Sequence, residues 1–207
     1  MTVTKITEIT KSRVKIETDT GDNFVLYKGE ARAYDIQEGR EIDEKSRKEI
    51  MTEVLPKRAK LRALNLLKSR AYTEAQLTDK LKAGGYPEAI IEEAMAYVCS
   101  FGYVDDRNYA RDFIEYNKEN KSKKRIFMDL CRKGVSRDIV EEVWNETAGE
   151  DTDELEKEQI LRWVVKKRFC AETATLQEKQ KMMAFLYRKG FGAAAIRNVL
   201  LLDITSI

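Results

Sequence analysis

Leucine, glycine and a second apolar residue recur with one spacing at several places in the chain. In one copy Leu130 is followed four residues later by Gly134 and then by Val135. This spacing is typical of a helix that ends in a Schellman turn, where glycine takes the left-handed conformation and the next apolar residue packs back on the helix. A second helix is then expected near Ser136, which is a good N-cap residue.

Two further copies keep this spacing around other residues. They are Leu81, Gly85 and Tyr86, and Leu186, Gly190 and Phe191. A related turn is predicted at Gly102 and Tyr103, before a helix that Asp105 or Asp106 caps. A helical hairpin cannot bury its apolar face alone, so the copies predict tandem units that stack into a long surface.

The apolar spacing changes from strand-like to helical near residue 43. Residues 1–42 are predicted to form a small β subdomain with a hairpin turn at residues 19–22, and residues 33–42 are expected to add a short strand or two. Residues 43–57 predict a connecting helix that starts at Asp43 and is interrupted by Pro56. Three-helix repeats are then expected at residues 58–104, 105–148 and 149–207.

The predicted fold class is therefore mainly α, with three tandem three-helix repeats forming an elongated curved array and a small N-terminal β-hairpin subdomain. Helix starts inside the repeats have recognisable caps. Thr73 with Gln76 and Thr175 with Glu178 have capping-box spacing, and Ser122 is expected to open a helix of the second repeat.

Charge is distributed in stripes along the chain. The 207 residues carry a formal net charge of only +2, although 36% of them are charged, so bulk charge predicts no partner. Residues 118–133 contain seven basic and two acidic side chains, whereas residues 135–160 contain ten acidic and two basic ones. Partner binding therefore has to be sought in local clusters.

The basic side chains recur on the first and second helices of the predicted repeats. The candidate partner-binding or DNA-binding residues of this basic track are Lys68, Arg70, Lys121, Lys123, Lys124, Arg125, Arg132, Lys133, Lys166, Lys167 and Arg168, with Arg188 and Lys189 in a similar place. One interpretation is a solvated helix face, because Lys and Arg favour helix ends. The other is a track that meets an acidic protein surface or a nucleic-acid backbone.

The sequence offers no catalytic constellation. It contains no histidine, no phosphate-binding glycine loop and no nucleophile elbow. Asp105 and Asp106 are adjacent at a helix start and are interpreted as capping residues. No catalytic residue, metal ligand or cofactor is expected, and Cys99, Cys131 and Cys170 are predicted to be reduced thiols in the core.

The chain lacks an apolar run long enough to cross a membrane and an N-terminal signal pattern. A cytoplasmic monomer without membrane contact is the expectation. A helix, a glycine turn and a second helix also describe a helix-turn-helix DNA reader, but two of the candidate recognition helices begin with acidic residues, as in Pro87-Glu-Ala-Ile-Ile-Glu-Glu. Sequence-specific DNA reading is therefore disfavoured.

Taken together, these segments resemble the RecX family, bacterial regulators of the RecA recombinase. The resemblance rests on Arg70-x-x-Thr-x-x-Gln-Leu-x-x-Lys-Leu-x-x-x-Gly-Tyr86, on Phe101-Gly-Tyr-Val-Asp-Asp-x-x-Tyr-Ala110 and on Leu130-x-x-Lys-Gly-Val135. Many members carry arginines after the second of these segments, where this chain has Phe113-Ile-Glu-Tyr-Asn. The cluster from Lys121 to Arg125 is the candidate to compensate.

The resemblance implies three tandem three-helix repeats and a non-enzymatic activity in DNA repair, recombination and the SOS response. Its members bind the RecA filament on single-stranded DNA and modulate, in the direction of inhibition, ATP hydrolysis and strand exchange. Weak, non-specific binding of single-stranded DNA is also expected. The alternatives kept open are a helical repeat protein that binds single-stranded DNA itself and a scaffold that binds other proteins without DNA.

Overall fold

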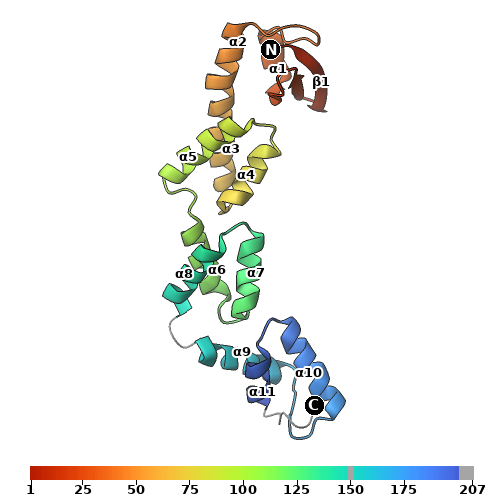
Figure 1. The fold of residues 1–207 in the computed structure, drawn as a ribbon, viewed down its shortest axis with the longest axis vertical. Helices are drawn as coiled ribbons and strands as arrows, with labels where there is room; N and C mark the ends of the chain where they lie inside the picture. The colour runs from red at the N-terminus through yellow and green to blue at the C-terminus, as the bar shows by residue number, and fades with distance from the viewer. Residues whose placement is uncertain (149–151, 201–207) are drawn as a thin grey trace. The chain divides into compact units, whose positions relative to one another are not determined.

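The computed structural model describes residues 1–148 and 152–200, which belong to two compact units that divide after Asp105. Figure 1 shows the order of the elements along the chain. The first unit contains strands β1 (Val3–Thr10), β2 (Arg13–Thr18) and β3 (Phe24–Tyr27), and helices α1 (Lys28–Ala33), α2 (Glu44–Glu49), η1 (Ile50–Val54), α3 (Leu55–Leu67), α4 (Glu74–Lys82) and α5 (Glu88–Ser100). The second contains α6 (Asp106–Asn117), α7 (Lys123–Arg132), α8 (Arg137–Ala148), α9 (Thr152–Lys166), α10 (Leu176–Arg188) and α11 (Ala193–Leu200).

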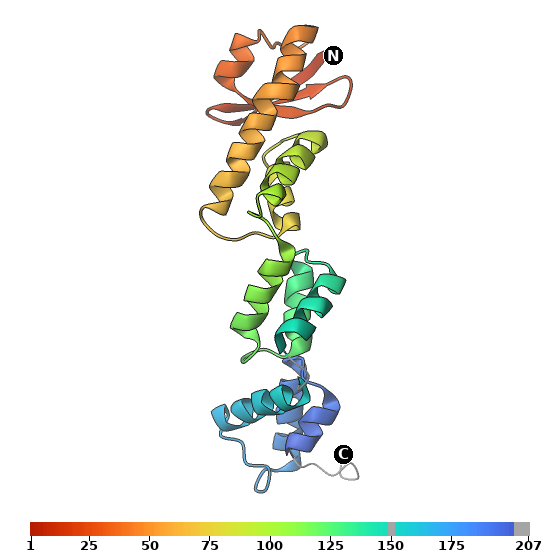
Figure 2. The same cartoon turned by 90° about the vertical axis from the view of Figure 1, so that its left-hand side faces the viewer.

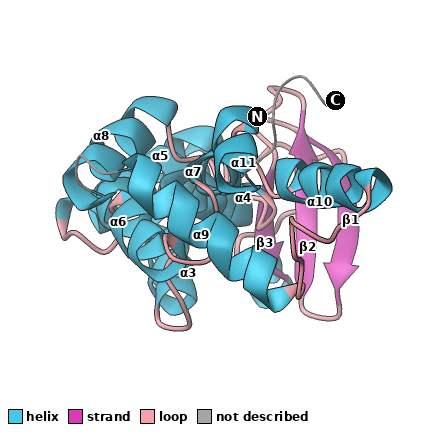
Figure 3. Cartoon of the chain, turned by 90° about the horizontal axis from the view of Figure 1, so that it is seen from below, coloured by secondary structure: helices cyan, strands magenta, loops and turns pink. Residues whose placement is uncertain are grey.

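The strands form one antiparallel sheet in the order β1-β2-β3 (Figure 3). Alternate residues of β2 face the core, so that Val14, Ile16 and Thr18 are buried while the residues between them are partly exposed. The register pairs Ile16 with Ile6 on one side and with Phe24 on the other. The predicted hairpin, with its turn at residues 19–22, is thus confirmed and joins β2 to β3.

The strands predicted within residues 33–42 are wrong. This segment begins at the end of helix α1 and continues as turns, with only an isolated bridge between Glu41 and Thr2. Asp35 (φ 47°) and Gly39 (φ 77°) have left-handed backbone conformations, which depart from the extended backbone of a regular strand. Ile36 and Ile42, which suggested the strand, are nevertheless buried.

Pro56 does not interrupt the helix either. Helices α2, η1 and α3 follow one another without a gap (Figure 2). One π-helical turn precedes the proline, and in it the Leu55 N–H bonds to the carbonyl of Ile50. This wider turn relieves the clash that a proline ring makes with the preceding helical turn. The predicted start of the helix is confirmed, since the Asp43 carboxylate accepts a hydrogen bond of 2.9 Å from the Ser46 N–H.

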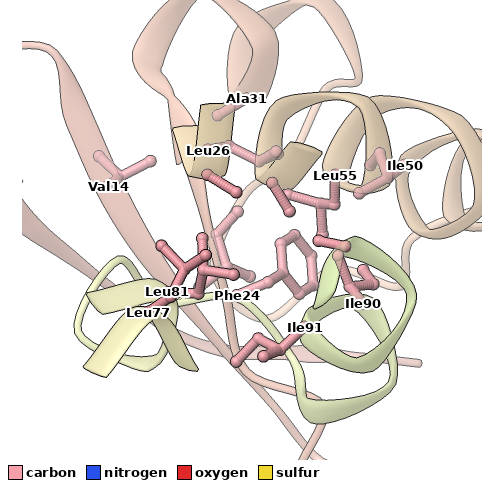
Figure 4. Close-up of a cluster of buried hydrophobic side chains, with 14 of the residues drawn as sticks. Val14, Phe24, Leu26, Ala31, Ile50, Leu55, Leu77, Leu81, Ile90 and Ile91 are labelled. Carbon is pink, nitrogen blue, oxygen red and sulfur yellow. The ribbon is translucent and has the colours of Figure 1, made fainter. Parts of the chain in front are cut away.

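One hydrophobic core joins the sheet to the first helical repeat. In Figure 4 Phe24 and Leu26 of β3 lie among Leu55 of α3 and Ile90 of α5, and all four are buried. At 25 cal/mol per Å² of apolar area, each such side chain contributes about 1.5–3 kcal/mol to folding. The sheet is therefore part of the same folding unit as the first repeat.

The second unit has two cores, one for each remaining repeat. The core of α6, α7 and α8 is centred on Ile126, Leu130 and Trp144, and the core of α9, α10 and α11 includes Ile160 and Leu186. With the first core, these account for the three-helix repeats that the sequence predicted.

Glycine adopts the predicted left-handed conformation at all four predicted turns, and the hydrogen bond that defines a Schellman turn is present at Gly102, Gly134 and Gly190. Gly85, Gly102, Gly134 and Gly190 all have positive φ angles between 68° and 94°. The Val135 N–H bonds to the Leu130 carbonyl at 3.2 Å, and the Phe191 N–H bonds to the Leu186 carbonyl at 3.3 Å. In the turn at Gly102 the N–H of Tyr103 likewise reaches Val98 at 3.0 Å.

Burial differs among these turns. Val135 and Phe191 are 3% and 2% exposed, whereas Tyr103 is 55% exposed and stacks on Phe101 with ring centroids 5.8 Å apart. Val104 takes the buried position beside Tyr103, at 4% exposure. The prediction that the residue after glycine packs back on the helix is therefore wrong for Tyr103.

The cysteines are free thiols, and the prediction that they lie in the core is wrong for Cys131 and Cys170, whereas Cys99 packs against the first core. Cys131 and Cys170 are exposed, and Cys99 is partly buried. Cys131 follows Leu130 on α7, and the residues of that helix that pack on the core are Ile126, Phe127 and Leu130. Within residues 1–148 and 152–200, no helix is long and apolar enough to span a membrane.

Candidate functional site

Ser122 joins the second repeat to the third. It is the N-cap of α7, where its Oγ accepts a hydrogen bond of 3.3 Å from the Arg125 N–H, as the sequence predicted. The same hydroxyl donates a hydrogen bond of 2.8 Å to the carbonyl of Lys189, which follows α10. The start of α7 and the end of α10 are thus held together by one buried side chain.

Gln159 makes a second connection between these repeats. This residue of α9 is 3% exposed, and its side-chain amide donates to the carbonyl of Lys121 at 3.1 Å and to that of Lys118. These carbonyls follow α6, beyond the last regular hydrogen bonds of that helix. The connection fixes the segment that leads into the basic start of α7.

Basic residues of the two repeats surround one hollow of about 450 Å³, which we call the inter-repeat hollow. Lys121 and Arg125 line it from the second repeat, and Arg188 and Lys189 line it from the third. Trp163 and Phe185 contribute aromatic walls. Clusters more than 60 residues apart in the sequence therefore lie around a common space.

A single carboxylate orders one side of this hollow. Asp129, whose side chain is 15% exposed, accepts Lys121 at 3.1 Å and Arg125 at 3.2 Å. One negative charge is shared by two positive charges there, so the wall stays cationic. The ion pairs are partly solvated and contribute little to folding, but they restrict where the two cations lie.

Most lysines of the basic track lie over aromatic rings. The distances from Nζ to ring centroid are 5.1 Å for Lys121 to Phe113, 5.5 and 5.4 Å for Lys123 to Phe127 and Trp144, 6.0 Å for Lys124 to Tyr187, 5.6 Å for Lys133 to Phe113, 5.0 Å for Lys166 to Trp163, 5.0 Å for Lys167 to Phe185 and 4.5 Å for Lys189 to Trp163. Each contact of this kind contributes roughly 0.5–1 kcal/mol at an exposed site. The ammonium groups are therefore held in place while their outer sides face solvent.

The remaining residues of the basic track are more dispersed. In the first unit Lys68 is exposed, and the guanidinium of Arg70 lies 4.3 Å from the ring of Tyr72. In the second unit Arg132 and Arg168 are exposed at helix ends. Lys123 and Lys124 border a separate cavity of about 650 Å³, together with acidic residues of α8 and α9. The structure therefore concentrates the candidate site on the second and third repeats.

One basic residue near the start of the first repeat has a structural role. Arg58 forms an ion pair of 2.8 Å with Glu30 and lies 4.3 Å from the ring centroid of Tyr27, and its side chain is only 17% exposed. These contacts hold α3 against the segment that contains Tyr27 and Glu30. A local excess of positive charge in the sequence does not by itself identify a binding residue.

The sequence interpretation did not identify Ser122, Gln159 or the aromatic partners as parts of the site. The sequence predicts Ser122 only as an N-cap, and no pattern in the sequence indicates its hydrogen bond to Lys189. Gln159 lies in an apolar helical pattern, where a polar residue at a buried position could have indicated a special contact. Phe127 lies four residues after Lys123 on α7, and Trp163 lies three residues before Lys166 on α9, which is a recognisable spacing, whereas Trp144, the other ring over which Lys123 lies, is on α8.

The acidic pair has the position expected of helix-starting residues. Asp105 immediately precedes α6, and Asp106 is its first residue and is 9% exposed. Across residues 1–148 and 152–200, the structure contains no group of three or more metal-ligating side chains that could hold a metal ion. The basic residues that line the inter-repeat hollow offer a cationic binding surface.

Comparison with known families matches all three repeats. A model described as RecX, first three-helix domain, matches residues 59–97. The models of the second and third RecX three-helix domains match residues 105–143 and 154–200. The second and third ranges cover most of the second and third cores, and the first range covers most of the helical part of the first core, which also includes the sheet.

Curated relatives and solved structures agree with this match. The regulatory protein RecX of Caldanaerobacter subterraneus subsp. tengcongensis is 35% identical over 167 residues, which is 80% of each chain, and that of Clostridioides difficile is 30% identical over 206 residues, covering 96% of this chain and 93% of the relative. A crystal structure of regulatory protein RecX shares the fold with a TM-score of 0.61 and 24% identity, over 96% of this chain and 98% of the other, and RecX from Lactobacillus salivarius shares it with a TM-score of 0.62 and 23% identity, over 72% and 96%. The chain therefore belongs to the RecX family of regulatory proteins.

Proposed function

We propose that this protein binds the RecA filament on single-stranded DNA and restrains its ATP hydrolysis and strand exchange, without catalysing a reaction of its own. The observation that best supports this is the inter-repeat hollow, where Lys121, Arg125, Arg188 and Lys189 come together. A filament on DNA is a repeating polyanionic partner. A cationic surface that continues from one repeat into the next suits a long, repeating partner better than a small, compact partner.

The manner in which the cations are held supports a binding role. An ammonium group that only solubilises a helix face is free to move, whereas Lys189 and Lys167 lie at 4.5 and 5.0 Å from ring centroids. Restricting a long side chain before binding lowers the entropy that is lost when it contacts a partner. The aromatic contacts therefore favour a surface prepared for association.

Reading of a specific DNA sequence is not supported by the last helix of each repeat. Helix α5 begins with Glu88, α8 carries Asp138 in its first turn, and α11 begins with three alanines. The one basic side chain in these first turns, Arg137 of α8, forms an ion pair of 2.9 Å with Glu141, so none of the starts offers a cluster of basic or amide groups to read base edges in the major groove. The partner is therefore recognised through charge and shape.

The second candidate is a protein that coats single-stranded DNA and acts by competition. The inter-repeat hollow supports it too, because phosphates would be attracted to the same cations. Binding to a preformed RecA filament, measured in parallel with binding to the bare oligonucleotide at the same salt concentration, separates the two. Our proposal expects tighter binding to the filament. Equal or weaker binding to the filament would favour the competitor, and binding to RecA without DNA would favour a protein scaffold.

A further inference from the structure

Helix α9 ends in a Schellman turn in which arginine replaces glycine. Arg168 has a φ of 51°, its N–H bonds to the Val165 carbonyl at 2.9 Å, and the Phe169 N–H bonds to the Val164 carbonyl at 3.1 Å. Phe169 packs on the core of the third repeat beside Val164. The hydrogen bonds and the apolar contact are those of a complete Schellman turn.

Glycine would be the favoured residue at this position. The left-handed conformation is strained for a residue with a Cβ atom, and the turns that end α4, α5, α7 and α10 use glycine. A cation near a helix C-terminus is favourable, but Lys166 and Lys167 already supply positive charge there. The helix itself therefore gives no reason to retain a third cation in a strained conformation.

Arg168 also borders a hollow, which we call the α9–α10 hollow. Its volume is about 460 Å³, and Lys167 and Lys181 line it with Arg168. Glu178 lines it as well, but its carboxylate accepts hydrogen bonds of 2.8 Å from the backbone N–H and the hydroxyl of Thr175. Three cations thus surround a space in which the acidic group is engaged in a capping box.

The two hollows share one wall. Phe185 lines both, with Lys167 at 5.0 Å from its ring centroid and Lys189 at 5.6 Å. The ring is therefore covered by ammonium groups and is a poor platform for stacking a base. A single strand of nucleic acid carries a phosphate at every nucleotide, and its backbone suits two cationic hollows that lie side by side.

We propose that the α9–α10 hollow binds phosphate groups of single-stranded nucleic acid and that Arg168 is retained, despite the strain, as a phosphate-binding residue. The planar guanidinium can donate two parallel hydrogen bonds to one phosphate, which lysine cannot do. The inference rests on the proposed function in that the strand is the one that the filament carries. It assigns the third repeat to the DNA rather than to an acidic surface of RecA.

The test is Arg168→Gly in the full chain, measured with an oligo(dT) probe by fluorescence anisotropy at several salt concentrations and by thermal unfolding. Removing the strain should raise the melting temperature by about 3 °C. Removing one phosphate contact should weaken oligo(dT) binding by about threefold to tenfold at low salt and lower the salt slope by about 0.7. Lys11→Gly, which removes one exposed cation from the β1–β2 turn, is the charge control and should leave oligo(dT) affinity nearly unchanged.

Arg168→Lys separates the two properties of the side chain. It keeps the charge and the strain but lacks the guanidinium fork, so its affinity should lie between that of the wild type and that of Arg168→Gly. A variant that is more stable but binds oligo(dT) as tightly as the wild type would overturn the inference, and so would a wild type that does not bind oligo(dT). A loss of binding confined to the RecA filament would assign the hollow to an acidic protein surface instead.

These outcomes are distinguishable from failure of the proposed function. If the wild type leaves RecA unaffected but its oligo(dT) binding depends on Arg168, the proposed regulation is wrong and the phosphate site stands. If the wild type inhibits RecA and Arg168→Gly binds oligo(dT) normally, only the phosphate site is wrong.

Discussion

Gly190 of the third repeat lies so close to Ser122 of the second repeat that a side chain at residue 190 would not fit. A Cβ atom added to Gly190 would come within 2.6 Å of the Ser122 Oγ, and the glycine has a φ of 94°. The serine hydroxyl is fixed in turn by its bonds to Arg125 and Lys189. The left-handed glycine therefore both ends α10 and allows the second and third repeats to approach.

Gly190→Ala tests this close approach. Strain at positive φ and the clash with Ser122 should together lower the free energy of unfolding of the second unit by roughly 2–4 kcal/mol. Gly102→Ala is the matched control, because Gly102 also ends a helix at positive φ but has open space where the Cβ would lie. That control should cost only about 1 kcal/mol. Chemical denaturation of both variants measures the difference, and equal losses would show that the repeats do not meet at Gly190.

A comparable contact in the first unit can be tested with a compensating pair. A Cβ atom on Gly85 would lie 2.2 Å from a methyl carbon of Val25 in strand β3. Gly85→Ala should therefore destabilise the first unit by roughly 2–4 kcal/mol. Val25→Ala removes the methyl group, so the double variant should lose less than the sum of the single losses. Additive losses, measured by urea denaturation, would contradict the contact between the sheet and the first repeat.

Acid should weaken the capping box of α10. Hydrogen bonds from the backbone N–H and the hydroxyl of Thr175 lower the pKa of Glu178. A carboxylate whose pKa is lowered by folding stabilises the native state above its unfolded pKa, and this stabilisation is lost as the pH falls through the folded pKa. Wild-type protein should therefore lose more thermal stability between about pH 5 and pH 3 than Glu178→Gln, whose amide cannot titrate. Parallel melting curves across this range would contradict the prediction.

At the start of α7, reversing the charge of a basic residue can reduce binding and stability together, so the two effects have to be separated. The sequence alone predicts that reversing the charges of Lys123, Lys124 and Arg125 leaves stability unchanged or slightly raised, because cations at the start of a helix oppose its dipole. The structure contradicts the assumption behind this expectation. Lys123 lies over Phe127 and Trp144, and Arg125 forms an ion pair with Asp129.

We therefore predict that Lys123→Glu with Arg125→Glu lowers stability by about 1 kcal/mol, through the lost ring contacts and through repulsion between residues 125 and 129. Lys124→Glu with Arg188→Glu should leave the thermal melting curve close to that of the wild type, because both side chains are exposed and the ring of Tyr187 is 6.0 Å from Lys124. If the second pair melted at a lower temperature than the first, these residues would be unsuitable as functional probes.

Much of the fold could be predicted because local rules determine it. Glycine at positive φ after Leu130 and Leu186, and caps at Asp43, Ser122 and Thr175, depend on residues within one or two helical turns. The turns between residues 33 and 42 depend on hydrogen bonds to the distant β1 segment, such as the bond from the Gly39 N–H to the Val3 carbonyl, whereas the π turn before Pro56 is a local alternative to the break that proline usually causes. Within residues 33–42 the buried Ile36 and Ile42 gave a strand-like pattern without a strand.

The candidate site was predictable only in part for the same reason. Runs of Lys and Arg are visible in the sequence, but whether a cation lies over a ring, binds a carboxylate or faces a partner depends on residues far along the chain. Arg58 and Arg125 engage acidic residues, while Arg188 and Lys189 line the same hollow as Lys121 where Ser122 and Gln159 join the repeats.

The central claim is that the cations of the second and third repeats restrain RecA. Its most direct test is ATP hydrolysis by RecA on single-stranded DNA with wild-type protein, Lys124→Glu/Arg188→Glu, and the charge-matched control Lys11→Glu/Lys45→Glu, whose changes lie on exposed residues of the first unit. We predict that the wild type and the control inhibit hydrolysis equally, whereas Lys124→Glu/Arg188→Glu requires at least tenfold more protein, a difference of about 1.4 kcal/mol. A wild type that leaves hydrolysis unchanged, or a folded Lys124→Glu/Arg188→Glu variant that inhibits as well as the control, would contradict the account.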